Sequence, residues 1–158
     1  MIQNKFLRNL CMVIIGILVG IWSSFKIIEK NLGALCELND KYFGMIKIFS
    51  MWMKFYEEGH SIDEYFKKNG YKSIAIYGMG FLGEHFFEQI KKTDIEVRYL
   101  IDQKGGTGYD KIPVFNIDEY LAPVDVIVIT PQFYFYQIKK QLKKNVNYKI
   151  ICIDEVFR

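Results

Sequence analysis

The chain has 158 residues, room for one ordinary domain and an extension, and 51% of them are hydrophobic, as in a globular protein. The formal net charge of +3, from 21 basic and 18 acidic side chains, is too balanced to argue for nucleic acid as a partner. The three cysteines show neither metal-ligand nor disulfide spacing, which fits a reducing compartment.

The first predicted element is an apolar segment near the N-terminus. Residues 10–25 carry no charge and lie between Arg8 and Lys26. About twenty apolar residues cross a bilayer, and the segment reaches that length if a flanking basic side chain extends to the membrane surface. We therefore predict a membrane anchor over residues 1–28. A signal peptide and a buried core helix are the alternatives, although no small-residue cleavage site follows.

An amphipathic helix is predicted next, over residues 29–59. A seven-residue repeat places nine apolar or aromatic side chains and one asparagine on one stripe: Phe25, Ile28, Leu32, Leu35, Asn39, Tyr42, Ile46, Phe49, Met53 and Tyr56. A buried asparagine at such a position fixes the register of two-stranded coiled coils. The repeat predicts a homodimer through residues 25–56. The alternative is a helix packed on its own domain, favoured by further apolar residues at Met45, Ile48, Trp52 and Phe55.

Two glycines lie inside this helical pattern, and a polar segment follows it. Gly33 and Gly44 each cost about 1 kcal/mol of helix propensity and argue against a long stiff rod. Residues 57–60 are expected to end the helix. Ser61 and Glu64 then match a capping box that opens a short helix ending at Gly70.

From residue 71 onward, β-rich and helical patterns alternate. Strands are expected at about 73–77, 96–101, 113–115, 125–130 and 149–153, with helices at about 81–92 and 133–144 and a helical turn capped by Asn116. This alternation predicts an α/β fold, a Rossmann-like doubly wound parallel sheet of about five strands in the order 3-2-1-4-5. We assign residues 60–158 to this nucleotide-binding domain, preceded by the two N-terminal helices.

A Gly-x-Gly-x-x-Gly motif follows the first expected strand, at Gly78, Gly80 and Gly83. The first glycine permits a tight turn, the second lets the backbone approach a pyrophosphate, and the third allows close packing of helix on strand. The amides that open the helix, at Phe81 and Leu82, lack partners within it and favour an anion. A glycine-rich turn in some other α/β domain is the alternative.

Three further residues are expected beside the glycine motif. Asp102 comes nineteen residues after Gly83, where a dinucleotide-binding βαβ unit places an acid against a ribose hydroxyl. Thr130 and Pro131 follow the fourth strand and should reach the same edge of the sheet. The set predicts NAD or a UDP-sugar as the ligand, without separating the two. An acid at Asp102 disfavours the 2′-phosphate of NADP.

No catalytic or metal-binding set is predicted. Tyr136 and Lys140 form a Tyr-x-x-x-Lys pair, which we interpret as a coincidence, and His60 and His85 are isolated. We expect no separate substrate domain after the fifth strand. Whether the chain is an enzyme stays open.

Four segments also show a family resemblance: residues 74–90 with the glycine motif, 96–102 with its acid, 111–115 with a proline before a strand, and 125–131. Residues 71–153 resemble the small Rossmann-like module of bacterial surface and capsular polysaccharide biosynthesis proteins, in its stand-alone, membrane-anchored version. The resemblance implies a nucleotide or nucleotide-sugar at the glycines and Asp102. It implies no reaction, because the catalytic domain of the larger enzymes has no counterpart here.

These observations lead to three functional hypotheses. The first is a membrane-anchored nucleotide-binding module, accessory to surface-polysaccharide synthesis. The second is an enzyme on nucleotide-sugars that is completed by dimerisation or by a partner. The third is a degenerate Rossmann domain that serves only as an interaction platform. We expect the C-terminal domain to be cytoplasmic, because nucleotide ligands and free thiols belong there.

Overall fold

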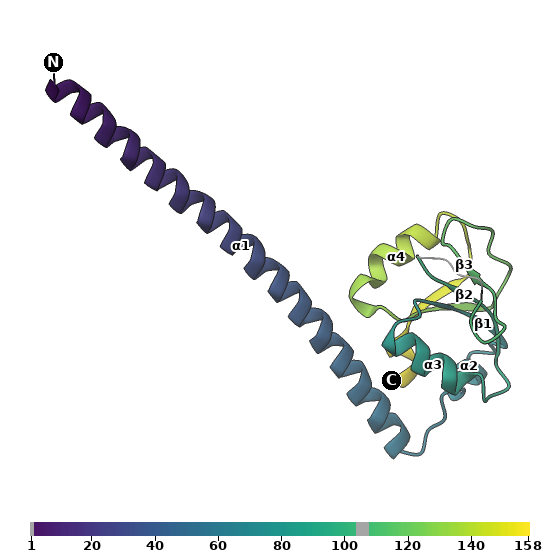
Figure 1. The fold of residues 1–158 in the computed structure, drawn as a ribbon. Coiled ribbons are helices and arrows are strands. Elements are labelled where there is room, and N and C mark those ends of the chain that lie inside the picture. The colour runs from purple at the N-terminus through teal and green to yellow at the C-terminus, as the bar shows by residue number, and fades with distance from the viewer. Residues whose placement is uncertain (1, 104–107) are drawn as a thin grey trace. The chain divides into compact units, whose positions relative to one another are not determined.

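The computed structural model describes residues 2–103 and 108–158, with side chains at Leu10 and from residue 12 onward. Its elements are shown in Figure 1. The chain divides into two compact units, residues 1–42 and residues 43–158.

The first element, α1, is a single helix from Ile2 to Glu57 that runs through both units. It continues through Gly33 and Gly44 over 56 residues, so the expectation that these glycines prevent one long helix is wrong. Neither has a positive φ, and each costs only about 1 kcal/mol of propensity. The helix ends where the sequence predicted: Gly59 takes a φ of +83°, and the N–H of His60 donates to the carbonyl of Phe55 at 3.2 Å.

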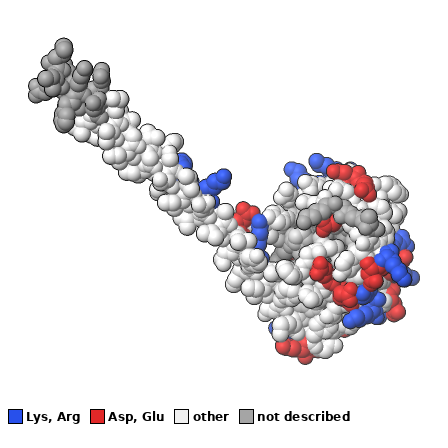
Figure 2. Space-filling view, in the orientation of Figure 1, with Lys and Arg blue, Asp and Glu red and all other residues white. Residues whose placement is uncertain are grey.

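The large apolar side chains of α1 in the first unit are exposed. Trp22 and Phe25 are both 64% exposed, and Leu35 is 61% exposed. Charged side chains are sparse along this part of the helix and crowd the surface of residues 43–158 (Figure 2). Within residues 12–57, the helix is long and apolar enough to cross a membrane, by length and composition.

Five parallel strands form one sheet in the order β3-β2-β1-β4-β5, which confirms the predicted order 3-2-1-4-5. The strands are β1 (Ser73–Tyr77), β2 (Glu96–Ile101), β3 (Val114–Phe115), β4 (Val126–Ile129) and β5 (Lys149–Cys152). All five residues of β1 and all four of β4 are buried, as expected of central strands that are covered on both faces.

Short helices connect and follow these strands: α2 (Glu64–Lys68), α3 (Phe81–Ile90), η1 (Gln132–Tyr134), α4 (Phe135–Leu142) and η2 (Ile153–Phe157). One of the two bonds of the predicted capping box forms, since the N–H of Ser61 donates to Oε1 of Glu64 at 2.8 Å. The helix itself begins at Glu64, with Asp63 at its N-cap and no hydrogen bond from a capping side chain. Asn116 caps a turn as predicted, because its Oδ1 accepts from the N–H of Asp118 at 3.3 Å, but the turn is not helical. Asn116 instead begins a reverse turn, in which its carbonyl accepts from the N–H of Glu119 at 3.1 Å.

The two faces of the sheet are covered by different helices, with α3 on one side and α4 on the other (Figure 1). Ile74 and Ile76 of β1 pack in the cluster that contains α3, whereas Ala75 and Tyr77 pack in the cluster that contains Ile138 of α4. This alternation follows from the two-residue period of a strand. Tyr77 therefore faces α4, on the side away from α3.

The end of α1 belongs to the core on the α3 face. Ile48, Trp52 and Phe55 are 1%, 5% and 9% exposed, and the Trp52 ring stacks on Phe157 with centroids 4.7 Å apart. The packed-helix alternative therefore holds for this part of the helix. The compact domain begins at Phe43 instead of His60, because residues 43–57 supply part of its core.

Candidate functional site

The glycine turn joins β1 to α3 at the carboxyl edge of the sheet. Gly78 takes a φ of +90°, and a Cβ there would lie 2.8 Å from Cδ of Pro131. A Cβ at Gly83 would lie 1.9 Å from the carbonyl oxygen of Gly78. Neither glycine can be replaced by a residue with a side chain. The positive φ of Gly78 forms the turn, and Gly83 lets α3 pack directly against that turn. These are the packing roles that the motif predicts for its first and third glycines.

Gly80 is different, because the fold itself does not require a glycine there. Its φ of −82° and ψ of −170° are extended backbone that any residue adopts, and no described atom lies within 4 Å of the position of a Cβ. The turn therefore leaves open space beside the backbone at the start of α3.

The first turn of α3 follows Gly80 directly and carries N–H groups that have no acceptor within the helix. The first bond within the helix is donated by Glu84 to the carbonyl of Gly80 at 2.9 Å. The N–H groups of Phe81, Leu82 and Gly83 precede that bond, so the helix provides no acceptor for them. The Phe81 side chain is 71% exposed, whereas Leu82 is 8% exposed and anchors the helix in the core. The backbone of this turn thus offers donors at the positive end of a helix dipole.

Asp102 follows β2 and lies against the same turn. Its Oδ2 accepts a hydrogen bond from the N–H of Met79 at 3.3 Å, although 23 residues separate the two in the chain. The N–H of Asp102 donates to the carbonyl of Phe115 at 3.0 Å, which fixes the backbone beside β3. The acid predicted to face a ribose is therefore beside the glycine motif.

Thr130 and Pro131 reach the turn from the end of β4. Thr130 is 2% exposed, and its hydroxyl donates to the carbonyl of Gly78 at 2.7 Å. This side chain holds the turn in place from beneath. Pro131 contacts the turn and lines the adjacent pocket. The fold thus brings together all eight residues proposed from the sequence, with Thr130 in a supporting position.

A pocket of about 410 Å³ opens from the turn toward α4. Its volume lies within the range of small-molecule sites. The residues that line it come from the ends of β1 and β2, from η1 and from α4: Tyr77, Gly78, Asp102, Gln103, Pro131, Tyr134, Gln137, Ile138 and Gln141. The glutamines and Tyr77 were not predicted as site residues. The spacing of Gln137 and Gln141, four residues apart on one helical face, was the available signal.

None of the catalytic candidates considered in the sequence lines this pocket. Nδ1 of His60 lies 2.9 Å from Oε2 of Glu64, and His85 packs edge-on against Phe49 with ring centroids 5.9 Å apart. Tyr136 is 85% exposed on α4. Among the described residues, no group of three or more histidine, cysteine, aspartate or glutamate side chains could hold a metal ion.

Comparison with known proteins gives a partial similarity. No family model matches the chain, and no solved structure matches it significantly. The chain is 30% identical over 97 residues to a protein of Lactococcus lactis subsp. cremoris (strain MG1363) named NADH oxidase. The match covers 60% of this chain and 20% of the relative, so the chain spans about a fifth of that protein's length.

Proposed function

We propose that residues 43–158 bind a nucleotide that contains a diphosphate, with NAD as the leading candidate, at the carboxyl edge of the sheet. The proposed ligand places its diphosphate beside Gly80 and its ribose at Asp102. The helix α1 holds this domain at a membrane, on the cytoplasmic side. The domain is a binding module, with no catalytic residue assigned.

The observation that carries the proposal is the open space at Gly80. Among the described residues, no atom beyond the neighbours of Gly80 in the chain lies within 4 Å of a Cβ there, and φ is −82°, so this part of the fold accepts a side chain. Packing explains why positions 78 and 83 are glycines. The glycine at position 80 is not explained by packing. A ligand that approaches the backbone supplies an explanation, because a Cβ would occupy the space that phosphate oxygens need.

The donors and the acid fit the two parts of such a ligand. Phosphate oxygens accept hydrogen bonds from the N–H groups of Phe81, Leu82 and Gly83, and the helix dipole favours their charge. A carboxylate such as that of Asp102 has about four lone-pair sites and accepts several hydrogen bonds at once, the bond from Met79 among them. It can therefore accept from a ribose hydroxyl, whereas it would repel the 2′-phosphate of NADP.

The partial similarity to a protein named NADH oxidase supports a nicotinamide nucleotide over a UDP-sugar. The UDP-sugar alternative and the link to surface-polysaccharide synthesis rest on the resemblance of residues 71–153. Both stay predictions.

Calorimetry on the purified full-length chain in detergent tests the proposal. NAD should bind more tightly than NADP, and Gly80→Val should abolish binding while the thermal unfolding temperature stays near that of the wild type. Asp102→Asn should weaken binding by about 1.5–3 kcal/mol, the range for a hydrogen bond to a charged group.

Gly33→Val is the matched control, since it makes the same change in open space within α1, away from the glycine turn, and should leave binding unchanged. If NAD, NADP and UDP-sugars all fail to bind at millimolar concentration, the glycine turn is structural. The interaction-platform hypothesis would then replace this proposal.

A further inference from the structure

We infer that the base of the nucleotide enters the pocket between the glycine turn and α4, and that the Tyr77 hydroxyl helps to select it. This inference rests on the proposed function and adds the part of the ligand that gives specificity. Its starting point is a buried polar group that packing does not explain.

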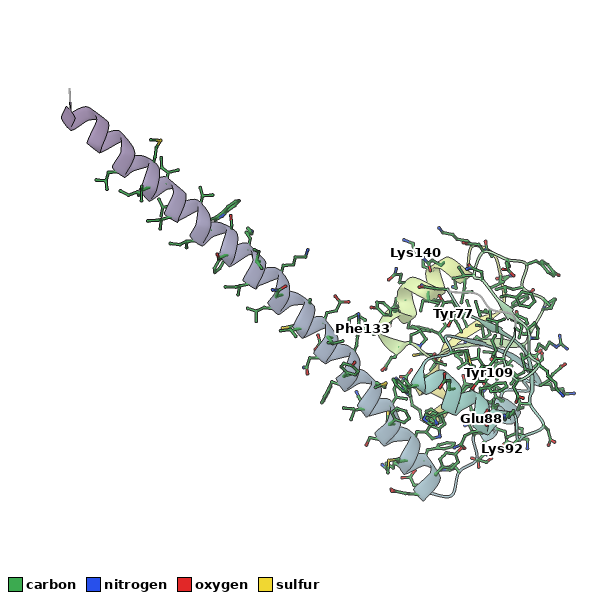
Figure 3. The ribbon with its side chains drawn as sticks, viewed as in Figure 1. Tyr77, Glu88, Lys92, Tyr109, Phe133 and Lys140 are labelled. Atoms are coloured by element: carbon green, nitrogen blue, oxygen red, sulfur yellow. The ribbon has the colours of Figure 1, made fainter. Side chains whose placement is uncertain are left out.

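Tyr77 is the last residue of β1 and lies between the sheet and α4 (Figure 3). The residue is 3% exposed, and its hydroxyl has no hydrogen-bond partner in the described part of the chain. A buried hydroxyl without a partner is costly, and phenylalanine would fill the same volume without that cost. A polar group at this position is therefore explained best by a ligand that bonds to it.

Burial raises the pKa of Tyr77, so the phenol stays protonated near neutral pH and acts as both donor and acceptor. The neighbouring Gln103 side chain partly opposes this shift, but the two groups form no well-aligned hydrogen bond. Tyr77 and Gln103 both line the pocket, so the buried hydroxyl of Tyr77 belongs to a side chain at its wall.

The three glutamines of the pocket match an uncharged partner. Gln103, Gln137 and Gln141 each offer an amide donor and an amide acceptor, and the described lining residues include neither lysine nor arginine. Pairs of donor and acceptor of this kind complement the edge of a nucleobase. Pro131, Tyr134 and Ile138 add apolar surface for the faces of a planar ring.

The pocket is continuous with the proposed diphosphate site. Gly78 and Asp102 belong to its lining, so a ribose at Asp102 sits at the mouth of the pocket. With the diphosphate at α3 on one side of the ribose, the base on the other side is directed toward α4. One extended ligand thus accounts for the open glycine, the acid and the unpartnered hydroxyl.

Calorimetry with ADP, UDP and NAD tests the inference, using full-length Tyr77→Phe. The variant should bind the preferred nucleotide about three- to tenfold more weakly, the loss expected for one neutral hydrogen bond. The ratio of the ADP and UDP dissociation constants should move toward one. Because the native hydroxyl has no partner to lose, the variant should unfold at or above the wild-type temperature.

Tyr136→Phe is the matched control, since that hydroxyl lies on the exposed surface of α4 and its loss should change neither affinity nor ratio. Gln137→Leu, which removes a different polar group of the pocket, should also change the ratio of the ADP and UDP dissociation constants. A wild-type ratio in Tyr77→Phe, or equal weakening of ADP, UDP and inorganic pyrophosphate, would overturn the inference while leaving the proposed function intact. Failure of the wild type to bind any nucleotide would instead contradict the proposed function.

Discussion

The two parts of helix α1 have similar apolar content and opposite surroundings. In residues 43–57, Ile48 and Trp52 are 1% and 5% exposed because the sheet and η2 cover them. In residues 12–42, Phe25 and Leu35 are 64% and 61% exposed. The comparison teaches that an apolar helix face does not specify its own partner. The second part packs in the core of its own domain, whereas the large apolar side chains of the first part are exposed.

The same contrast limits the predicted homodimer. Two positions of the seven-residue stripe already contact α3: Phe49 packs against His85, and the Tyr56 hydroxyl donates to Oε1 of Gln89. Positions from Phe25 to Ile46 remain exposed, the latter at 61%. If a second copy pairs with this chain along the stripe, we expect it between residues 25 and 46. The homodimer stays a prediction, over a shorter segment than the sequence suggested.

The largest expected effect is on solubility, when residues 43–158 are separated from the exposed N-terminal part of α1. The full-length chain should fractionate with membranes, and a fragment of residues 43–158 should be soluble, because it lacks the exposed apolar segment and keeps its core. A fragment of residues 60–158 should aggregate, because it loses Ile48, Trp52 and Phe55. Ultracentrifugation of lysates checks all three. Recovery of the intact full-length chain in the soluble fraction would rule out the anchor.

A smaller effect is expected from weakening the buried part alone. Trp52→Ala in the fragment 43–158 should lower the free energy of unfolding by about 3–5 kcal/mol, because it removes a large core side chain that stacks on Phe157. Urea unfolding followed by circular dichroism measures the change. Met53→Ala is the control one residue away, since that side chain is 63% exposed and should cost less than about 1 kcal/mol. Equal losses in the two variants would contradict the buried position of Trp52.

The smallest effect concerns the exposed part of the helix. In a full-length chain whose three cysteines are replaced by alanine, Leu35→Cys should form crosslinks between chains, whereas Lys30→Cys, off the stripe, should not. Asn39→Leu should change the crosslinking pattern, because the asparagine is the one polar residue of the stripe. Non-reducing electrophoresis of membranes reports the outcome. Equal crosslinking at positions 30 and 35 would mean that the stripe is no specific interface.

Local pattern was enough to predict the sheet. Each strand is a short β-rich run bounded by turn residues, and the glycine motif fixes where β1 passes into α3, so the order 3-2-1-4-5 followed. The contact between Asp102 and the turn was expected for the same reason.

The burial of the end of α1 and the lining of the pocket could not be predicted, because both depend on contacts between distant parts of the chain. Trp52 was assigned to a helix face from spacing alone, and nothing local indicates that Phe157 stacks on it. Tyr77 looked like an ordinary β-former, because its unpartnered hydroxyl is visible only once α4 covers that face. Gln137 and Gln141 likewise become pocket residues only through the position of α4 above the carboxyl edge of the sheet.

The stack of Trp52 on Phe157 also sets an order of events during synthesis of the protein. Trp52 leaves the ribosome long before Phe157 exists, so the buried face of residues 43–57 has to wait for this partner while the whole sheet is being made. Until then, the apolar segment of α1 is available to the membrane-insertion machinery, and the domain cannot close its core around the end of the helix. If α1 inserts into a membrane as proposed, insertion would precede completion of the domain, and a ribosome that stalls before residue 157 would leave an inserted helix with an open core.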